Sequence, residues 1–466
     1  MTPVSYFCSV FLFLCFCTFS SHVFAQQVNF QKPVEIQLTP YKTTLYADGK
    51  DNALIKVKII DKKGDEVFNS KKIVAFHISG DGFIKSVKGT GVQILFHSDT
   101  LWSASIIGDC DIIFIAGKSK SIIHFEASAD SLYKGSTDFQ TLFHETAHKV
   151  TNGVYLPKKV NDKILGADIS FLPELESKGM KFKDKGTQKD VLTILKEHGF
   201  NYIRLRIFND PANTNGYSPE LGFCDLEHTK QMAKRIKAAG LKFLLDFHYS
   251  DYWADPGHEY KPAAWQGQDF KTLETSLYTY TLHVMQQLKE QGTLPDMVQV
   301  GNEINHGMVW PEGMISNLDS LAALIYEGFK AIKEVNPATP VILHIALGGQ
   351  NAESRFFLDN MKKRNVPFDI IGLSYYPKWH GTLSDLKNNM TDLANRYHKQ
   401  VMVAEYSFLK KEVNDIAFSF PNHMALGTFI WEPLSTWEMF FDRKGNTNEL
   451  INVYPLIAKK YHIGKY

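Results

Sequence analysis

The stretch Met297-Val298-Gln299-Val300-Gly301-Asn302-Glu303 is a short apolar run that ends in polar residues. Such a run is typical of a strand in a parallel sheet that is covered on both faces. The same pattern recurs seven more times along the chain, at Ile164–Ser170, Tyr202–Ile207, Phe243–His248, Val341–Ala346, Ile370–Tyr376, Val401–Glu405 and Thr428–Glu432. The sequence therefore predicts eight buried strands.

Helical segments separate these runs. The stretch Leu226–Gly240, for example, has helical character and closes on a glycine, which is a common C-terminal signal of a helix. Eight strands that alternate with helices over about 300 residues match the count of a (β/α)8 TIM barrel. The predicted fold class is thus α/β, and in a barrel the chemistry sits at the carboxyl ends of the strands.

The predicted strand ends carry carboxylates, arginines, histidines and aromatic residues. They include Asp168 and Ser170, Arg204 and Arg206, the run Asp246–Gly257, Gly301-Asn302-Glu303, His344, the run Ser374–His380, Ala404-Glu405 and Trp431-Glu432-Pro433. This set contains no cysteine nucleophile, no glycine-rich phosphate loop and no serine in an elbow motif.

Glu303 and Glu405 are the candidate catalytic pair. A glycosidic bond is broken by two carboxyl groups, of which one protonates the leaving oxygen and the other attacks the anomeric carbon. The fourth and seventh strands lie across the barrel mouth, so glutamates at their ends can face each other. A separation of about 5–5.5 Å between them allows the retaining route, and about 6.5–9.5 Å the inverting one.

Several segments resemble family-53 glycoside hydrolases in order along residues 161–455. They are Gly166–Ser170, Arg204-Leu205-Arg206, Asp246–Pro256, Gly301-Asn302-Glu303, Ser374–Pro377, Trp379–Leu383 and Trp431-Glu432-Pro433. These enzymes are endo-β-1,4-galactanases of a retaining clan, which has its acid/base on strand four and its nucleophile on strand seven. The resemblance implies a secreted enzyme that cleaves β-1,4-galactan in type I arabinogalactan, a pectin side chain of the plant cell wall.

The resemblance also implies individual roles. Glu303 would be the acid/base, Glu405 the nucleophile, and Asn302 the partner of the sugar 2-hydroxyl. Arg204 would bind near the nucleophile, His248 and Tyr375 would line the cleaving subsite, and Trp431 would form its aromatic floor. Further substrate contacts are expected from Trp253, Asp255, Trp379 and His380.

Electrostatics give these roles a physical basis. The nucleophile must be ionised before attack, so we expect Arg204 to hold the pKa of Glu405 down. The acid must be protonated, and ionised Glu405 nearby should raise the pKa of Glu303.

The seventh strand departs from the family pattern. Tyr406-Ser407-Phe408 follows Glu405, where the family usually has threonine next, and only 25 residues separate Glu405 from Trp431. Many bacterial members bind calcium through an acidic loop here, but Lys410–Asp415 lacks its alternating oxygen ligands. We therefore expect no cofactor and no metal ligands, and a short loop that leaves the cleft more open.

The residues before the barrel are β-like. Asn52–Ile60 alternates between apolar and polar residues, and Asp61–Asp65 supplies turn chemistry. Further short strands up to Ala129 predict a small immunoglobulin-like β-sandwich, similar to the bacterial modules attached to secreted glycosidases. The predicted boundaries are sandwich 26–140, linker 141–160 and barrel 161–466. A sugar-binding module and a packed spacer both remain open as its role.

The first 25 residues read as a cleaved signal peptide, because a short apolar core precedes small residues and Ala25. An uncleaved N-terminal anchor and a lipoprotein are the alternatives. Cleavage would remove Cys8, Cys15 and Cys17 and leave Cys110 and Cys224, which we expect to be unpaired. The predicted location is extracellular, cell-surface or periplasmic in a bacterium, with no membrane span after processing.

Composition limits the partners. Lys and Arg total 51 against 50 Asp and Glu, and a net charge of +1 disfavours nucleic-acid or anionic-membrane binding. Aromatic residues make up 13% of the chain, which suits both a core and sugar-stacking surfaces. The expected partner is a neutral polysaccharide, and we expect a monomer.

Three alternatives remain open. His144-Glu145-Thr146-Ala147-His148 fits the H-E-x-x-H pattern of zinc metalloproteases. The barrel could be degenerate and bind galactan without cleaving it, which would require a geometric defect around strand seven. A third alternative is a retaining glycosidase of the same clan that acts on xylan or mannan.

Overall fold

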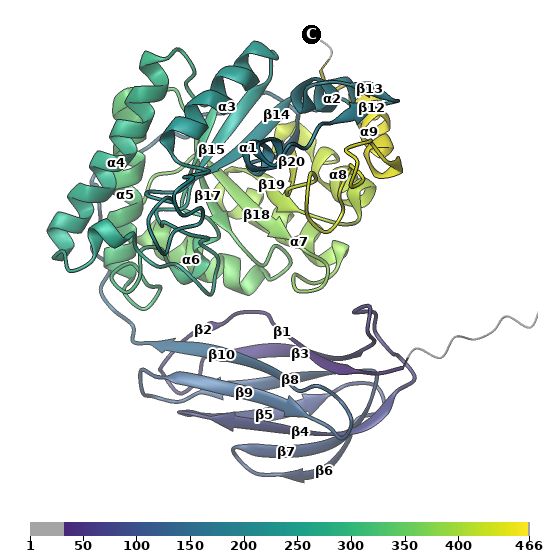
Figure 1. The fold of residues 1–466 in the computed structure, drawn as a ribbon. Helices are drawn as coiled ribbons and strands as arrows, with labels where there is room; N and C mark the ends of the chain where they lie inside the picture. Colours follow the sequence, from purple (N-terminus) through teal and green to yellow (C-terminus); the bar gives the residue numbers. More distant parts are fainter. Residues whose placement is uncertain (1–31, 465–466) are drawn as a thin grey trace, which may run out of the picture.

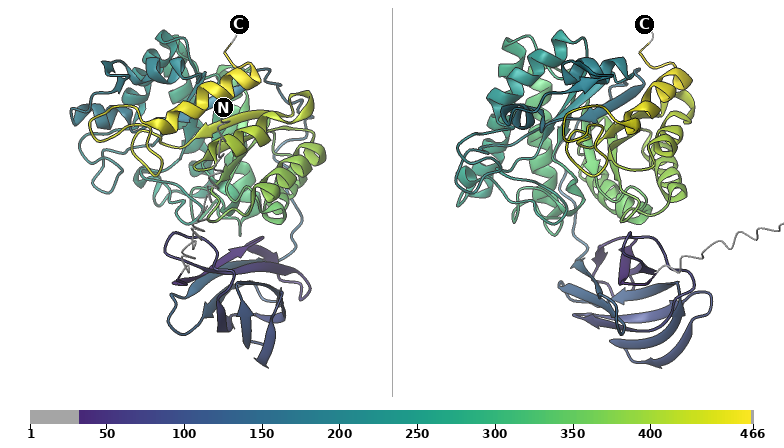
Figure 2. Two further views of the ribbon diagram at one scale, coloured as in Figure 1. Left: turned by 90° about the vertical axis from the view of Figure 1, so that its right-hand side faces the viewer. Right: turned by 45° about the vertical axis from the view of Figure 1, so that its right-hand side comes forward.

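A computed structural model of the protein describes residues 32–464, so the predicted signal peptide lies outside the described residues. The chain forms a β domain and a larger α/β domain, which one connecting segment joins (Figure 1). The two views in Figure 2 show the same two bodies from other sides.

The N-terminal domain is the predicted β-sandwich. Its strands pair antiparallel, except that β10 runs parallel to β2. Alternate side chains of β3, such as Ile55, Val57 and Ile59, point into a core of their own. The strands are β1 (Glu35–Pro40), β2 (Thr44–Tyr46), β3 (Asn52–Ile60), β4 (Lys71–Ser79), β5 (Gly82–Lys88), β6 (Gln93–His97), β7 (Leu101–Ile107), β8 (Asp109–Ala116), β9 (Ile122–Ser128) and β10 (Gly135–Leu142).

The C-terminal domain is a closed barrel of eight parallel strands, as predicted from the eight apolar runs. The strands are β11 (Ile164–Asp168), β14 (Tyr202–Ile207), β15 (Lys242–Phe247), β16 (Met297–Val300), β17 (Val341–Ile345), β18 (Ile370–Tyr375), β19 (Gln400–Tyr406) and β20 (Ala425–Ile430). A short hairpin, β12 (Lys183–Asp184) and β13 (Thr187–Gln188), lies outside the barrel.

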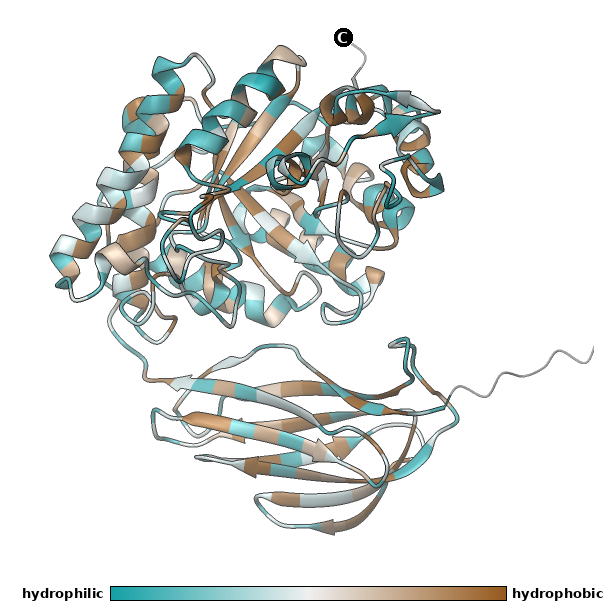
Figure 3. Cartoon of the chain, viewed as in Figure 1, coloured by the Kyte–Doolittle hydropathy of each residue, from teal (hydrophilic) through white to brown (hydrophobic). Residues whose placement is uncertain are grey.

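Helices surround the barrel (Figure 1). They are α1 (Leu172–Ser177), α2 (Val191–Glu197), α3 (Leu226–Ala238), α4 (Phe270–Glu290), α5 (Leu318–Val335), α6 (Asn351–Lys363), α7 (Leu383–Tyr397), α8 (Lys410–Phe418) and α9 (Val453–Tyr461). Figure 3 shows brown, hydrophobic segments along the barrel strands and mixed teal and brown turns on the helices, as expected for helices with one buried face.

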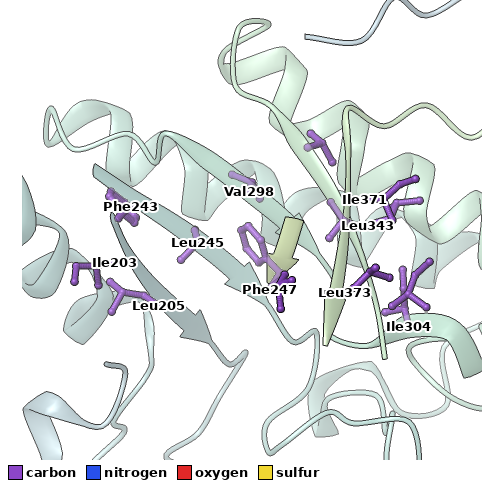
Figure 4. Packing of buried hydrophobic residues seen from close by; sticks show 14 of the residues in the cluster. Ile203, Leu205, Phe243, Leu245, Phe247, Val298, Ile304, Leu343, Ile371 and Leu373 are labelled. Atoms are coloured by element: carbon purple, nitrogen blue, oxygen red, sulfur yellow. The ribbon is translucent and has the colours of Figure 1, made fainter. Parts of the chain in front are cut away.

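Strand alternation divides the barrel core into two layers. On β15, Phe243, Leu245 and Phe247 point outward into the layer beneath the helices (Figure 4), whereas Leu244 joins the small cluster inside the barrel. Side chains alternate between faces along a strand, so Asp246 also points inward, near the barrel mouth. The same alternation decides which polar residues reach the site.

The segment between the domains does not form a zinc motif. Residues 144–148 contain no helix, which the H-E-x-x-H arrangement requires. The His144 ring stacks on Tyr46 at 3.9 Å, while His148 Nδ1 contacts Asp319 on α5. The two histidines therefore have different partners, and the structure contradicts the metalloprotease alternative.

The sandwich is hydrogen-bonded to the barrel domain. The Thr43 N–H donates to Glu353 Oε2 at 2.7 Å, and Thr43 Oγ1 lies 2.6 Å from His306 Nε2. Glu353 is only 1% exposed, so this contact lies in a buried interface. A second contact joins Gln37 Nε2 to the Lys378 carbonyl at 2.5 Å.

Two further features bear on the predictions. Cys110 lies buried in the sandwich and Cys224 buried in the barrel domain, both as free thiols. Within residues 32–464, no helix combines the length and the apolar character needed to cross a bilayer.

Candidate active site

A pocket of about 730 Å³ opens at the carboxyl ends of the barrel strands. It contains both candidate catalytic glutamates and all but one of the predicted substrate contacts. Its lining residues are Asp168, Arg204, Arg206, His248, Trp253, Ala254, Asp255, Pro256, Asn302, Glu303, Ala346, Leu347, Tyr376, Trp379, His380, Glu405, Trp431 and Trp437.

A change in backbone conformation after β16 places two consecutive side chains in the pocket. Val298 and Val300 pack outward, whereas Gln299 points inward to the polar network. Glu303 has a left-handed backbone (φ 53°), which is uncommon for a non-glycine residue. Asn302 and Glu303 therefore both line the pocket instead of alternating between faces.

A bulge in β19 places Glu405 in the pocket. Val403 pairs with Leu373 on β18, but Glu405 pairs with Ser374, so Ala404 has no partner in the register. Ala404 packs inside the barrel, and Tyr406 packs outward, where its hydroxyl lies 2.9 Å from that of Tyr454 on α9. The extra residue turns Glu405 into the mouth, consistent with the frequent occurrence of bulges beside active sites.

Arg204 lies at the centre of the buried polar network. Its Nη1 donates to Asp168 Oδ2 at 2.8 Å and to Glu405 Oε2 at 2.9 Å. Its Nη2 donates to Asp246 Oδ2 and to Asn302 Oδ1, both at 2.8 Å. One guanidinium thus fixes the nucleophile candidate and the neighbour of the acid candidate, as its planar fork of donors permits.

The pKa of Glu405 differs from the expectation. Burial raises the pKa of Glu405 above its usual value, although Arg204 and the hydrogen bond from Tyr376 both act to lower it. The sequence predicted the direction of the Arg204 effect but not the larger cost of removing the carboxylate from water.

The pKa of Glu303 is raised further, to about 8, mainly by burial and next by the charge of Glu405. Arg204 contacts Glu405 directly and acts on Glu303 only weakly, so Glu405 ionises first. Near neutral pH this gives one carboxylate and one carboxylic acid, the combination that glycoside hydrolysis needs.

Glu303 is hydrogen-bonded to a buried series of side chains, Ser374, His344 and Gln299. The Ser374 hydroxyl hydrogen-bonds to Glu303, and His344 Nε2 lies 2.9 Å from that hydroxyl. His344 Nδ1 lies 2.8 Å from Gln299 Nε2, and burial lowers the pKa of His344 well below its usual value. A neutral His344 that accepts from Gln299 at Nδ1 can donate to Ser374 at Nε2.

The prediction for Tyr375 requires a correction. Tyr375 packs outward from β18, and its hydroxyl donates to the Gly381 carbonyl at 3.2 Å. The next residue, Tyr376, lines the pocket and donates to Glu405 Oε1 at 2.5 Å. Adjacent strand residues face opposite sides, so the tyrosine pair offered a choice that only the register settles.

Both predicted histidines line the pocket, and each has a ring nitrogen with a hydrogen-bond partner within the protein. His248 accepts the Ala254 N–H at Nδ1 (3.1 Å), and its Nε2 lies 3.1 Å from Asp246 Oδ2. Both nitrogens thus have protein partners, and His248 shapes the pocket wall. His380 donates from Nδ1 to the Ser374 carbonyl, and burial lowers the pKa of His380 to about 4.

Aromatic side chains form one side of the pocket. Trp431 lies 6.2 Å from Trp253 and 5.1 Å from Trp437, measured between ring centroids. The Arg206 Cζ lies 4.1 Å from the centroid of Trp253 and 4.4 Å from that of Phe171, and these two rings are themselves edge to face.

Four charged or aromatic residues of the pocket lining, Asp168, Arg206, Tyr376 and Trp437, are absent from the predicted site. Asp168 and Arg206 had been recognised as strand-end residues, and their inward alternation was the available signal. For Tyr376, the prediction named the neighbouring Tyr375 instead. Trp437 comes from the loop after β20, where no periodic pattern marked it.

The segment Lys410–Asp415 does not fit a calcium ion. It forms the start of α8, and Lys410 binds Glu438 while Lys411 binds Asp415 at 2.8 Å. Lys460 also reaches Asp415, at 2.7 Å. Lysines that neutralise the local carboxylates leave no oxygen cage of the kind that Ca²⁺ requires.

Three relatives show where the similarity lies. An uncharacterized protein in the bgaB 5' region of Niallia circulans is 48% identical over 254 residues, which is 53% of this chain and 67% of that protein. An endo-beta-1,4-galactanase of Bacillus subtilis is 38% identical over 53% of this chain and 57% of its own length. An arabinogalactan endo-beta-1,4-galactanase A of Aspergillus niger is 35% identical over 56% and 74%, respectively.

Two solved structures of family-53 enzymes and galactanases are similar to this chain in both sequence and fold. The GH53 catalytic domain of Ignisphaera aggregans is 31% identical with a TM-score of 0.60, over 65% of this chain and 99% of that one. A structure of fungal beta-1,4-galactanases is 29% identical with a TM-score of 0.57, over 62% and 98%.

Two family patterns match, one for each domain. The pattern of glycoside hydrolase family 2 C-terminal domain 5 matches residues 36–138, within the sandwich. The pattern of glycosyl hydrolase family 53 matches residues 164–420, more than half of the chain, and includes both pocket glutamates. With that extent of match and the same barrel in the solved relatives, the chain belongs to glycosyl hydrolase family 53.

Proposed function

We propose that the protein hydrolyses β-1,4-galactosidic bonds within galactan, the backbone of the cell-wall polysaccharide type I arabinogalactan, with retention of configuration. One observation carries the proposal: Glu303 and Glu405 share a pocket in which one carboxyl group is held next to Arg204 and the other is kept protonated. The substrate is proposed from the relatives, which are endo-β-1,4-galactanases of Bacillus subtilis and Aspergillus niger.

The first step forms a covalent intermediate. Ionised Glu405 attacks the anomeric carbon while Glu303 gives its proton to the glycosidic oxygen, and the bond between that carbon and that oxygen breaks. The leaving sugar departs with a hydroxyl group, and the remaining chain is held as an ester of Glu405. Ester formation removes the charge of Glu405, so the pKa of Glu303 falls as it becomes a base.

The second step releases the product. Glu303, now ionised, takes a proton from water, and the water oxygen attacks the anomeric carbon on the face where the leaving sugar was. The ester bond breaks, Glu405 regains its charge, and Glu303 regains its proton. Two inversions give net retention.

The same geometry argues against a non-catalytic galactan-binding protein. That alternative required a defect around the seventh strand. Instead, Glu405 is held from two sides, by Arg204 at 2.9 Å and by Tyr376 at 2.5 Å. A pocket that served binding alone would have no need to fix and tune a second carboxyl group.

A panel of polysaccharides tests the proposal. We expect purified protein to release reducing ends from β-1,4-galactan and arabinogalactan but not from xylan or mannan. Glu405→Gln and Glu303→Gln should each lower the rate on galactan by about 10³-fold or more and keep the same thermal unfolding. If reducing ends were released from xylan or mannan instead of galactan, the proposed substrate would be wrong. Full activity of either variant would overturn the catalytic assignment.

We further propose that the mature chain acts outside the cytoplasm, as a monomer and without a metal cofactor. The leader-like residues 1–25 support the location. Activity that survives EDTA, a monomeric mass in solution and a mature N-terminus near residue 26 in the secreted fraction are the expected results.

A further inference from the structure

A second hollow, about 510 Å³ in volume, lies between the two domains. The sandwich supplies one wall through Gln37, Lys58 and residues 63–66, which lie in the loop between β3 and β4. The barrel domain supplies the other through Trp379, Phe408 and Trp437. We call this hollow the interdomain groove.

The groove is continuous with the catalytic pocket. Tyr376, Trp379 and Trp437 line both, and Tyr376 itself donates to Glu405. A polymer bound across Glu303 and Glu405 can therefore pass over these shared residues into the groove. The volume of the catalytic pocket, about 730 Å³, suits a few sugar units, whereas a polysaccharide continues beyond it.

The barrel wall of the groove is an exposed aromatic surface. Trp437 lies 5.1 Å from Trp431 in the pocket, and Phe408 stacks on Trp437 at 6.3 Å with 17° between the rings. Trp379, Phe408 and Trp437 are 44%, 42% and 53% exposed, respectively. Adjacent exposed aromatics that lead away from a catalytic centre provide flat apolar faces for a ligand.

The sandwich wall is polar and locally ordered. The Asp61 carboxylate accepts the N–H groups of Lys63 and Asp65 (2.8 and 3.0 Å), which fixes the turn. Lys58 and Glu66 pair at 2.9 Å at its base. The side chains of Lys63 and Asp65 are exposed, and they offer a donor and an acceptor opposite the aromatic wall.

The two walls are held at a fixed separation. Gln37 bonds to the Lys378 carbonyl next to Trp379, and Thr43 bonds to buried Glu353 on α6. The Thr43–Glu353 contact is buried and therefore costly to break, and the exposed Gln37 contact adds a second tie beside the groove, so the groove is preformed. The sandwich is thus packed onto the rim of the catalytic cleft and is not a freely tethered module.

We propose that the sandwich forms one wall of an additional subsite that binds further sugar units of the polysaccharide strand held in the catalytic pocket. Sugar faces stack on Phe408 and Trp437, and hydroxyl groups bind Lys63 and Asp65. This inference rests on the proposed function, because the bound strand is the one that the glutamates cleave. It assigns the sandwich a role in substrate binding that depends on the barrel.

The test compares substrates of different length. With a series of β-1,4-galactan oligomers, we expect kcat/KM of the wild type to keep rising beyond the length that fills the pocket. In the double variant Lys63→Ala/Asp65→Ala, kcat/KM on long galactan should fall about threefold to tenfold, and that on the shortest cleaved oligomer should not change. Phe408→Ala should behave in the same way, through loss of stacking.

The matched control is Lys62→Ala/Asp130→Ala, which removes one lysine and one aspartate that are exposed on the same domain but outside the groove. It should match the wild type at every length. Equal losses on short and long oligomers, or no loss in either groove variant, would overturn the inference. Absence of galactan cleavage by the wild type would instead overturn the proposed function, and the length series would then use the polysaccharide that is cleaved.

Discussion

At the scale of single residues, the hydroxyl of Tyr376 is the closest neutral donor to the nucleophile candidate, at 2.5 Å from Glu405 Oε1. A hydrogen bond to a charged group contributes about 1.5–3 kcal/mol. We therefore expect Tyr376→Phe to lower kcat/KM about 10- to 100-fold and to raise the pKa of Glu405. The measurement is the kcat/KM profile on galactan against pH, in which the acid limb should move to higher pH.

Tyr375→Phe is the matched control for this prediction. Tyr375 is adjacent in sequence but bonds outward to Gly381, so its hydroxyl is remote from the pocket. Its activity and acid limb should remain near those of the wild type. An equal loss in both variants would show that the effect is structural.

The raised pKa of Glu303 sets the alkaline limit of activity. Burial and Glu405 raise the pKa of Glu303 to about 8, and the acid must be protonated, so kcat/KM should decline above about pH 8. The Ser374 hydrogen bond acts in the opposite sense, because it favours the ionised form. Ser374→Ala should therefore shift the alkaline limb to higher pH.

Ser136→Ala, an exposed serine of the sandwich, controls for the loss of a hydroxyl group as such and should leave the profile unchanged. A shift of the Ser374→Ala limb to lower pH would contradict the assigned hydrogen bond.

At the scale of elements, the β19 bulge depends on a glycine opposite it. A Cβ at Gly372 on β18 would meet the Ala404 Cβ at 2.9 Å and Ile342 Cγ2 at 3.1 Å. In Gly372→Ala, the added methyl group should displace Ala404 and with it the neighbouring Glu405. A displacement near 1 Å lowers the rate about 100-fold. We expect a large fall in kcat with a smaller change in KM, measured on galactan with protein of verified secondary structure.

Gly153→Ala is the control at this scale, because a Cβ there would meet only Thr151 Oγ1, at 3.5 Å. It should keep full kcat. Wild-type kcat in Gly372→Ala would mean that the bulge does not position the nucleophile.

At the scale of the whole molecule, Thr43 links the stability of the two domains. Its hydroxyl lies 2.6 Å from His306 Nε2 and 3.1 Å from Glu353 Oε1, in a buried interface. Thr43→Val leaves these groups without that partner and should lower the free energy of unfolding by about 1–3 kcal/mol. Thermal unfolding of the full chain measures the change.

Thr43→Ser keeps the hydroxyl and should recover most of the loss. If the serine variant were as unstable as the valine variant, packing of the methyl group rather than hydrogen bonding would hold the interface.

The fold and most of the site were predictable because both rest on local patterns. Apolar runs marked all eight strands, and the barrel rule then placed their polar ends in one mouth. Glu303, Glu405, Arg204 and Asn302 follow from that rule and the resemblance. The prediction for Tyr375 was wrong, because a shift of one residue along a strand moves a side chain to the opposite face of the sheet.

The sequence by itself determined the strands, the alternation of their faces and the chemical types at the barrel mouth, since these depend on neighbouring residues. Only the tertiary structure decided which of two adjacent tyrosines reaches Glu405, and that a bulge at Ala404 turns the nucleophile inward. It also decided the pKa of Glu405, because burial is a property of the whole molecule. The groove between the domains depends likewise on contacts between residues far apart in the sequence, such as Thr43 and Glu353, which are 310 positions apart and which no local pattern links.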